Sequence, residues 1–361
     1  GRKIEPVVVD PASNWPLFAE KARELITVQK VDVMFGCWTS VSRKSVLPVI
    51  EELNSLLFYP VQYEGEESSK NVFYTGAAPN QQAIPATDYY LEELGVKKFA
   101  LLGTDYVYPR TTNKILKQYL IDKGIPESDI FVNYTPFGHS DWSKIVSDVV
   151  SLGADGKKVG VISTINGDAN IGFYKELAAA GVKADDIPVV AFSVGEEELS
   201  GLDTKNLVGH LAAWNYFQSA ESDLNSKFIS SWKSKMGNKR VTNDPMEAHV
   251  IGFEMYVKAV EKAGSTNVDA VRKAMYGLKV PNLTGGIAEM LPNHHLSKPV
   301  LIGEILENGQ FDIISQTKEV PGDAWTDHLA ESASLKSDWK TLGCGMYNTK
   351  AKKCIQIKSN Y

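Results

Sequence analysis

The sequence predicts an α/β fold with two lobes, and two patterns lead to this prediction. Short apolar runs alternate with helical patterns over roughly the first 215 residues, and from about residue 216 helical stretches are followed by short extended runs. Strands that alternate with helices indicate parallel, right-handed βαβ units covered on both sheet faces. A chain of 361 residues that is 43% hydrophobic has enough material for two cores.

Each expected element rests on an apolar run or on helical periodicity. Pro16 suits the first turn of the first helix. The expected strands of the alternating part are Val7–Val9, Val31–Phe35, Leu56–Tyr59, Lys98–Leu102, Ile130–Tyr134, Val159–Ser163 and Val189–Phe192. The expected helices there are Trp15–Thr27, Val41–Leu53, Ile115–Lys123, Trp142–Leu152 and Phe173–Ala180. Beyond them we expect helices at Ala220–Lys235, Pro245–Ala263 and Val268–Tyr276, and extended runs at Ile287–Met290, Pro299–Ile305 and Phe311–Ser315.

Composition excludes two classes of partner. The net charge is −6 and basic residues do not cluster, so a nucleic-acid partner is not expected. No stretch approaches the roughly 18 to 20 consecutive apolar residues that cross a bilayer, so direct membrane insertion is not expected either. We recognise no signal peptide, so export has to be inferred.

Two of the three cysteines lie close together near the end of the chain. Cys344 and Cys354 flank a short loop in which Asn348 suits a turn. A disulfide between them is natural in an oxidising compartment such as a periplasm, and two unpaired thiols are the alternative. Cys37 then remains as a small buried hydrophobe.

Polar and aromatic residues follow four of the expected strands. Ligands of parallel α/β sheets bind beyond the carboxyl ends of strands, so these clusters predict one shared pocket. Helix capping and core packing are the alternative for each cluster taken alone. The clusters contain Trp38 and Ser40, then Tyr59, Val61 and Gln62, then Tyr106 and Tyr108, and last Glu196.

Such a pocket suits a small, neutral, polar ligand, and signals for enzymatic chemistry are poor. Ser193 lies in a turn that resembles a nucleophile elbow, but Ala191 stands where that motif needs glycine. No histidine has metal-site spacing, and His294–His295, beside Pro292, is expected to be a surface turn. No G-x-G-x-x-G or P-loop occurs, so we expect neither a metal nor a cofactor, and no catalysis.

Four segments of roughly residues 1 to 320 resemble the urea-binding subunits of ABC transporters, relatives of periplasmic short-chain-amide and branched-chain amino-acid receptors. The segments are Gly36-Cys37-Trp38-Thr39-Ser40 with Arg43-Lys44, Tyr59-Pro60-Val61-Gln62-Tyr63-Glu64-Gly65, Ala78-Pro79-Asn80-Gln81, and Gly103-Thr104-Asp105-Tyr106-Val107-Tyr108-Pro109-Arg110.

The resemblance implies a type I periplasmic-binding-protein fold, or Venus flytrap, in which three crossovers join two Rossmann-like lobes. The crossovers would lie near 75–78, 212–214 and 297–300. Lobe one would hold residues 1–76 and 213–298, lobe two would hold 77–212 and 299–326, and 327–361 would be a C-terminal extension. Family members begin with a further strand and helix, which we expect to precede residue 1.

The same resemblance implies the ligand contacts and the partner. The matching positions are Trp38, Ser40, Tyr59, Val61, Gln62, Tyr106 and Tyr108. The similar amide receptor has tyrosine and proline where this chain has Trp38 and Gln62, and the added amide favours urea over acetamide. The chain is then expected to be a periplasmic or extracytoplasmic receptor that delivers urea to an ABC-importer permease.

Three other functions remain open. A receptor for short-chain amides or branched-chain amino acids has the same build, but an amino acid would need a carboxylate, which only Glu196–Glu198 could supply. A cytosolic sensor and an amide hydrolase are further alternatives. In the urea reading, Ser40 donates to the urea oxygen, Gln62, tyrosine oxygens and Glu196 accept from its nitrogens, and Trp38 and Tyr106 exclude water.

Overall fold

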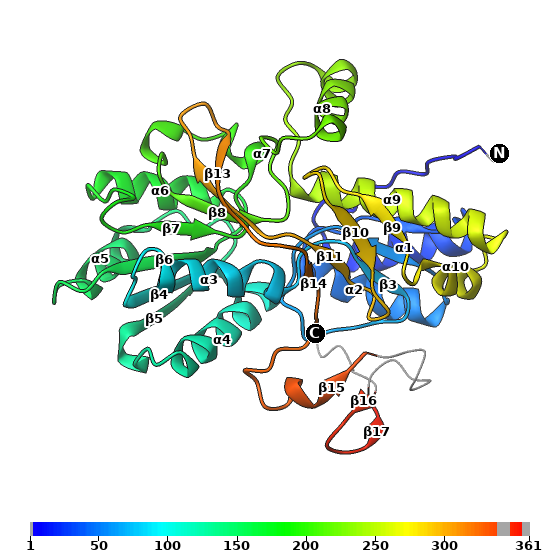
Figure 1. Ribbon diagram of the computed structural model, residues 1–361, viewed down its shortest axis with the longest axis horizontal. Helices are drawn as coiled ribbons and strands as arrows, with labels where there is room; N and C mark the ends of the chain where they lie inside the picture. Colours follow the sequence, from blue (N-terminus) through cyan, green and yellow to red (C-terminus); the bar gives the residue numbers. More distant parts are fainter. Residues whose placement is uncertain (1–2, 338–346, 356–361) are drawn as a thin grey trace.

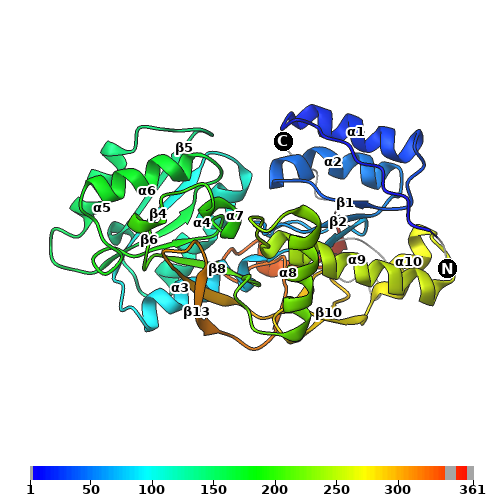
Figure 2. The same cartoon turned by 90° about the horizontal axis from the view of Figure 1, so that it is seen from above.

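The computed structural model describes residues 3–337 and 347–355. Two lobes lie side by side, one around a seven-stranded sheet and the other around a three-stranded and a four-stranded sheet (Figures 1 and 2). The fold is the type I periplasmic-binding-protein fold that the sequence predicts.

The seven-stranded sheet has its strands in the order β13-β12-β8-β7-β6-β4-β5. Successive residues of one strand face opposite sides: Phe99 and Leu101 pack in one core, and Ala100 and Leu102 in another. Its strands are β4 (Lys98–Thr104), β5 (Ile130–Thr135), β6 (Val159–Thr164), β7 (Val189–Ala191), β8 (Leu211–Trp214), β12 (Leu301–Ile305) and β13 (Phe311–Gln316). Both faces are therefore buried, as the continuous apolar runs predict.

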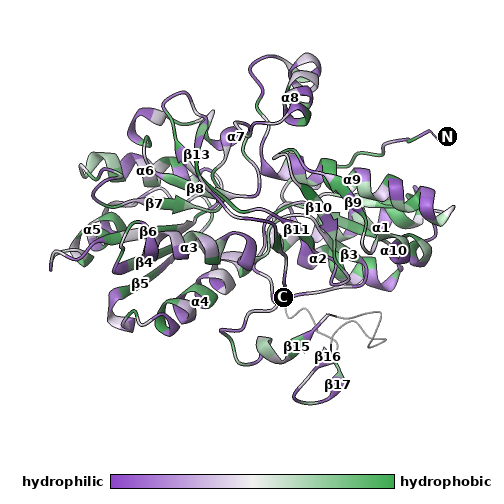
Figure 3. Cartoon of the chain, in the orientation of Figure 1, coloured by the Kyte–Doolittle hydropathy of each residue, from purple (hydrophilic) through white to green (hydrophobic). Residues whose placement is uncertain are grey.

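Helices cover both faces of this sheet. One core takes its helical side chains from α3 (Ala83–Glu92) and α4 (Val107–Asp122), and the other from α5 (Ser143–Leu152) and α6 (Ala169–Ala179). Figure 3 shows hydrophobic strands inside the sheet and mixed colouring on the helices, as expected for helices with one buried face. The short α7 (Glu196–Leu199) follows β7.

The other lobe has a small parallel sheet of β1 (Met34–Phe35), β2 (Leu57–Tyr59) and β3 (Val72–Tyr74). Leu57 and Tyr59 pack in a core with α2, while Phe58 packs in a second core with α9. The helices of this part are α1 (Trp15–Thr27), α2 (Ser40–Glu52), α8 (Asp223–Met236), α9 (Asp244–Ala263) and α10 (Val268–Met275). The antiparallel sheet contains β9 (Lys279–Pro281), β10 (Ile287–Met290), β11 (Leu296–Lys298) and β14 (Val320–Pro321).

The chain passes between the sheets of the two lobes after β3, β8, β11 and β13, one passage more than the three expected, because β14 returns to pair with β11. Two buried amide side chains join these passages. The Asn215 side chain donates to the carbonyls of Gln81 (3.0 Å) and Pro299 (2.8 Å), and the Gln81 side chain donates to those of Leu296 and Val320, both at 2.8 Å. Connections that are far apart in the sequence are thus held together at one place.

One expectation about strands is wrong. Val7–Val9 forms no strand, and the Val8 side chain is 89% exposed. An apolar run becomes a strand only where a neighbouring strand pairs with it, and the described chain offers Val8 no such neighbour. The strands of the alternating part, β4 to β8, pair in parallel as expected, and β12 pairs antiparallel with both β8 and β13.

The expected surface turn at His294–His295 is a further error, because both side chains are buried. His294 stacks on Phe73 with ring centroids 4.3 Å apart, and His295 stacks on Tyr74 at 4.8 Å. Burial lowers the pKa of His294 to about 3 and that of His295 to about 4. Pro292 and Asn293 indicate a turn correctly, but the two histidines that follow are buried because their rings stack on aromatic rings of β3.

The end of the described chain forms a small sheet of β15 (Leu335–Lys336), β16 (Tyr347–Asn348) and β17 (Lys353–Cys354), which lies below the lobes in Figure 1. Cys354 is disulfide-bonded and Cys37 is free. Cys344, the expected partner of Cys354, lies outside the described residues.

Candidate functional site

The loop between β1 and α2 places three site residues in different environments. Trp38 is 44% exposed, whereas Thr39 and Ser40 are buried. Ser40 is the first residue of α2, and its hydroxyl donates to Glu64 at 2.5 Å. The Ser40 proton is therefore already bonded within the protein, and the expected donation from Ser40 to a ligand oxygen stays a prediction. The Thr39 hydroxyl is buried and has no hydrogen-bond partner among the described residues.

A buried group of charges lies directly behind Ser40. Arg43 donates to Glu64 at 3.1 Å and to Glu67 at 2.7 Å, and Lys44 lies 2.6 Å from Glu67. Burial opposes ionisation of Glu67, but Arg43 and Lys44 outweigh it and hold the pKa of this carboxyl below its ordinary value. The Arg43 guanidinium also lies 4.5 Å from the Tyr59 ring centroid. We name Arg43, Lys44, Glu64 and Glu67 the charge quartet.

Gln62 joins the two lobes. It follows β2, and its side-chain nitrogen donates to the Phe192 carbonyl (2.8 Å) and the Ser193 hydroxyl (2.9 Å), which follow β7. A carbonyl oxygen only accepts, so the Phe192 contact fixes which end of the amide is nitrogen. The Gln62 side-chain oxygen is buried and has no hydrogen-bond partner in the part of the chain that the structure describes.

Two buried tyrosine hydroxyls lie beside these groups. The Tyr108 hydroxyl is close to Ser193 and Gln62, and the Tyr59 hydroxyl is close to Ser40. Neither hydroxyl makes a hydrogen bond of ordinary geometry with a described residue. Burial raises the pKa of both phenols far above the ordinary value, so both keep their protons at neutral pH.

Tyr106 extends the cluster from the second lobe toward the first. Its hydroxyl accepts from the Asn166 amide at 2.5 Å and lies close to Thr39. The Asn166 side-chain oxygen is buried and without a partner among the residues described. Val61, by contrast, is buried in the core that contains Tyr59, and its backbone packs against Gly76.

Glu196 is buried, but its described contacts are with residues outside this cluster. Its carboxyl accepts from the Gln218 backbone nitrogen at 2.6 Å, and it lies near the Asp244 carboxyl. Burial raises the pKa of Glu196 to about 8. A ligand contact from Glu196 therefore stays a prediction.

The raised pKa of Glu196 predicts a pH-dependent stability. Its ordinary pKa is 4.5, so between about pH 5 and pH 8 the folded state holds a proton that the unfolded state has lost. The free energy of unfolding should therefore fall as pH rises through this range, and Glu196→Gln should reduce that fall. Guanidinium denaturation at pH 5 and at pH 8 measures this change in the free energy of unfolding. Glu197→Gln, which changes an exposed pair with Arg240, is the control, and equal pH slopes in both variants would contradict the assignment.

Sequence reasoning singled out several residues of this cluster and overlooked others. Asn166 follows β6. The rule applied to the other strands, that polar residues just after a strand can line a site, would have identified it. Glu64 and Arg43 lie inside the motifs already noted, but their pairing joins positions 21 residues apart, and no local pattern signals it.

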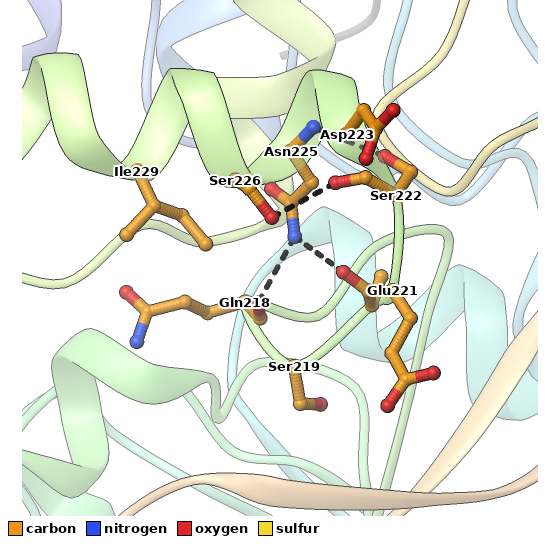
Figure 4. Close-up of a pocket in the computed structure, with 9 residues that line it drawn as sticks. Gln218, Ser219, Glu221, Ser222, Asp223, Asn225, Ser226 and Ile229 are labelled. Carbon is orange, nitrogen blue, oxygen red and sulfur yellow. Dashed lines mark hydrogen bonds between the residues drawn. The ribbon is translucent and has the colours of Figure 1, made fainter.

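The larger of the described cavities lies elsewhere. It has a volume of about 520 Å³ and opens beside the first turn of α8 (Figure 4). The Asn225 side chain there donates to the carbonyls of Gln218 and Ala220 and accepts from the Tyr216 hydroxyl. Because this central amide is already bonded and the acidic residues Glu221 and Asp223 are exposed, we place the ligand site at the inter-lobe cluster instead.

Neither a metal site nor a membrane-spanning helix is found in the described residues. Within residues 3–337 and 347–355, no group of three or more His, Cys, Asp or Glu side chains is arranged to hold a metal ion. The helices described there are too short or too polar to cross a membrane.

Comparison with known proteins identifies the family. Residues 1–331 match the family model described as a periplasmic binding protein domain. The Leu/Ile/Val-binding protein homolog 6 of Brucella melitensis is 23% identical over 87% of this chain and 80% of its own length. The structure of an ABC-transporter solute-binding protein from Rhodopseudomonas palustris HaA2, in complex with p-hydroxybenzoic acid, matches with a TM-score of 0.75 and 20% identity over 86% of this chain and 84% of that one.

A partial match concerns an enzyme. The limonene hydroxylase of Geobacillus stearothermophilus is 30% identical over 141 residues, which are 38% of this chain. The chain spans only 26% of the length of that relative. This match does not carry the relative's activity to this chain.

Proposed function

We propose that this chain, which belongs to the periplasmic binding protein domain family, is an extracytoplasmic receptor that captures urea and delivers it to an ABC-importer permease. One observation carries the proposal. Buried polar atoms without described partners come together from both lobes, and leaving such atoms unpaired costs free energy unless a ligand bonds to them. They are Thr39 Oγ1, Tyr59 Oη, Gln62 Oε1, Tyr108 Oη and Asn166 Oδ1.

The chemistry of these atoms favours a ligand rich in N–H groups. The oxygens of Gln62 and Asn166 can only accept, while the three hydroxyls can accept or donate one proton each. Urea presents N–H donors on both nitrogens and one carbonyl oxygen, which matches many acceptors and few donors. The carboxylate group of a ligand such as the p-hydroxybenzoic acid of the similar structure brings acceptors only, and the phenol of that ligand adds a single donor.

The charges around the site favour a neutral ligand. The charge quartet consists of two cations and two anions, so it places no net charge behind Ser40. An amino acid would need a fixed carboxylate for its ammonium group and a fixed donor set for its carboxylate. Glu196 is directed at the Gln218 backbone and does not face the cluster through any described contact. The amino-acid alternative therefore has less support than urea.

Binding would act through closure of two lobes. We assign residues 1–76 and 213–298 to lobe one and residues 77–212 and 299–326 to lobe two, with residues 327–361 as an extension. Within the last range of lobe two, β14 returns to pair with β11 of lobe one. Gln62 of lobe one already contacts Phe192 of lobe two. A ligand bonded to both lobes stabilises the closed arrangement, which the permease would recognise. At about −1.5 kcal/mol per heavy atom, urea can supply roughly −6 kcal/mol, which corresponds to a Kd of tens of micromolar.

A thermal-shift panel tests the proposal. A ligand at about one hundred times its Kd stabilises the folded state by about 2.7 kcal/mol, so a few millimolar urea should raise Tm clearly. Acetamide should raise it less, and leucine and p-hydroxybenzoate should leave it unchanged. A shift with leucine or p-hydroxybenzoate and none with urea would overturn the ligand. Ammonia release during incubation with urea would favour the amide hydrolase instead, because a receptor produces none.

A further inference from the structure

We propose that Glu64 determines which class of ligand the site binds. Because Glu64 accepts the hydrogen bond of the Ser40 hydroxyl, the side of the site formed by Ser40 and Tyr59 accepts hydrogen bonds from the ligand. Amides are therefore bound and carboxylates are rejected. The proposal rests on the proposed function and adds a specificity-determining residue that does not itself touch the ligand. It is carried by the buried contacts of Ser40, Glu64 and Arg43.

The geometry fixes the direction of the Ser40 hydroxyl. A carboxylate has no proton to give, so the 2.5 Å contact between Ser40 and Glu64 requires Ser40 to be the donor. Arg43 Nη1 also donates to the Ser40 oxygen, at 3.2 Å. The single proton and one lone pair of Ser40 are thus in use, and only a lone pair is left.

The polarity continues to the next hydroxyl. Tyr59 is buried beside Ser40, and because Ser40 has no free proton, Tyr59 can only donate toward it. The Tyr59 oxygen then also offers a lone pair. The Tyr59 proton occupies the remaining Ser40 lone pair, so it is the Tyr59 oxygen that meets the ligand. It calls for an N–H group, whereas a carboxylate oxygen would meet its lone pairs.

The charge quartet holds Glu64 in place. One Glu64 oxygen faces Arg43 Nη2 at 3.1 Å, and the other accepts from Ser40. Glu64 and Ser40 are each about 1% exposed. Arg43 is in turn held by Glu67. Glu64 therefore has no freedom to release Ser40 without breaking its ion pair.

Glu64→Gln tests the proposal with little change in volume. Arg43 requires an acceptor, so the oxygen of the introduced amide should face Arg43 and its nitrogen should face Ser40, which sends the Ser40 proton toward the ligand. Urea, acetamide and acetate are planar and similar in size, and their Kd values are measured by calorimetry. We expect urea affinity to fall about tenfold and acetate affinity to rise about tenfold, one hydrogen bond being involved in each case.

Glu67→Gln is the matched control, because it changes the net charge of the quartet equally without touching Ser40. If the ratio of the acetate Kd to the urea Kd changed equally in both variants, net charge alone would explain the effect and the proposal would be overturned. An unchanged ratio in Glu64→Gln would overturn it too.

Ser40→Ala keeps the proposal testable if the charge variants do not fold. The variant removes the oxygen that accepts the Tyr59 proton and so frees that proton for the ligand, which should weaken urea binding about tenfold while leaving acetate binding no weaker. A loss of acetate affinity as well would mean that Ser40 donates to ligands, contrary to the proposal. A folded wild type that binds no urea would overturn the proposed function itself, whereas wild-type urea binding with these variant results reversed would overturn only the role of Glu64.

Discussion

Replacing Arg43 with methionine should lower the free energy of unfolding by about 3–5 kcal/mol, because it leaves the buried Glu64 without its close cation and Glu67 with Lys44 alone. Arg43 is fully buried and is bonded to both Glu64 and Glu67. Lys44 alone cannot replace it, since it lies 4.0 Å from Glu64. Guanidinium chloride is the denaturant of choice, because urea is the expected ligand.

Arg23→Met is the control for this prediction. Arg23 forms an ion pair with Glu52 at 2.6 Å, but both side chains are largely exposed. Exposed pairs contribute about 0–1 kcal/mol. If Arg43→Met cost no more than Arg23→Met, the charge quartet would not be the structural support that its contacts indicate.

Gln62→Leu should weaken urea binding by about ten- to one-hundredfold. The change removes an acceptor from the site and the bond from Gln62 to the Phe192 carbonyl that joins the lobes, so that this carbonyl keeps only the longer bond from Gln82. Each loss corresponds to about 1 kcal/mol or more. Calorimetric titration with urea and acetamide measures both the loss and its selectivity.

Gln82→Leu is the matched control for Gln62→Leu. Gln82 is similarly buried and also donates to the Phe192 carbonyl, at 3.2 Å, but its second bond goes to the Ala213 carbonyl rather than into the site. It should lower Tm and keep the preference for urea over acetamide. Equal losses for urea and acetamide in Gln62→Leu would show that Gln62 does not select between them.

Long periodic segments of this fold could be predicted from the sequence, and short strands could not. The helix Trp15–Thr27 has the predicted bounds because its periodicity and Pro16 are local signals. β3 has only three residues, Val72–Tyr74, and it is defined by its partner strand β2. Val7–Val9 shows the converse, because a suitable apolar run without a pairing strand stays irregular.

The candidate site also has a part that the sequence predicts and a part that it does not. Tyr59, Gln62, Tyr106 and Tyr108 follow strands, and strand ends are visible in a sequence. The direction of the Ser40 hydroxyl depends on Glu64, 24 residues away, so it had to be seen in the fold. For this reason the proposed role of Ser40 differs from the sequence expectation, in which Ser40 donates to a ligand oxygen.

Calorimetric titration of the purified chain with urea, in parallel with acetamide, leucine and p-hydroxybenzoate, tests the central claim most directly. The account predicts one saturable site for urea with a Kd of about tens of micromolar, weaker binding of acetamide, and no heat from the other two. Saturable heat from leucine or p-hydroxybenzoate with none from urea would keep the fold and contradict the claim that an acceptor-rich inter-lobe site selects urea.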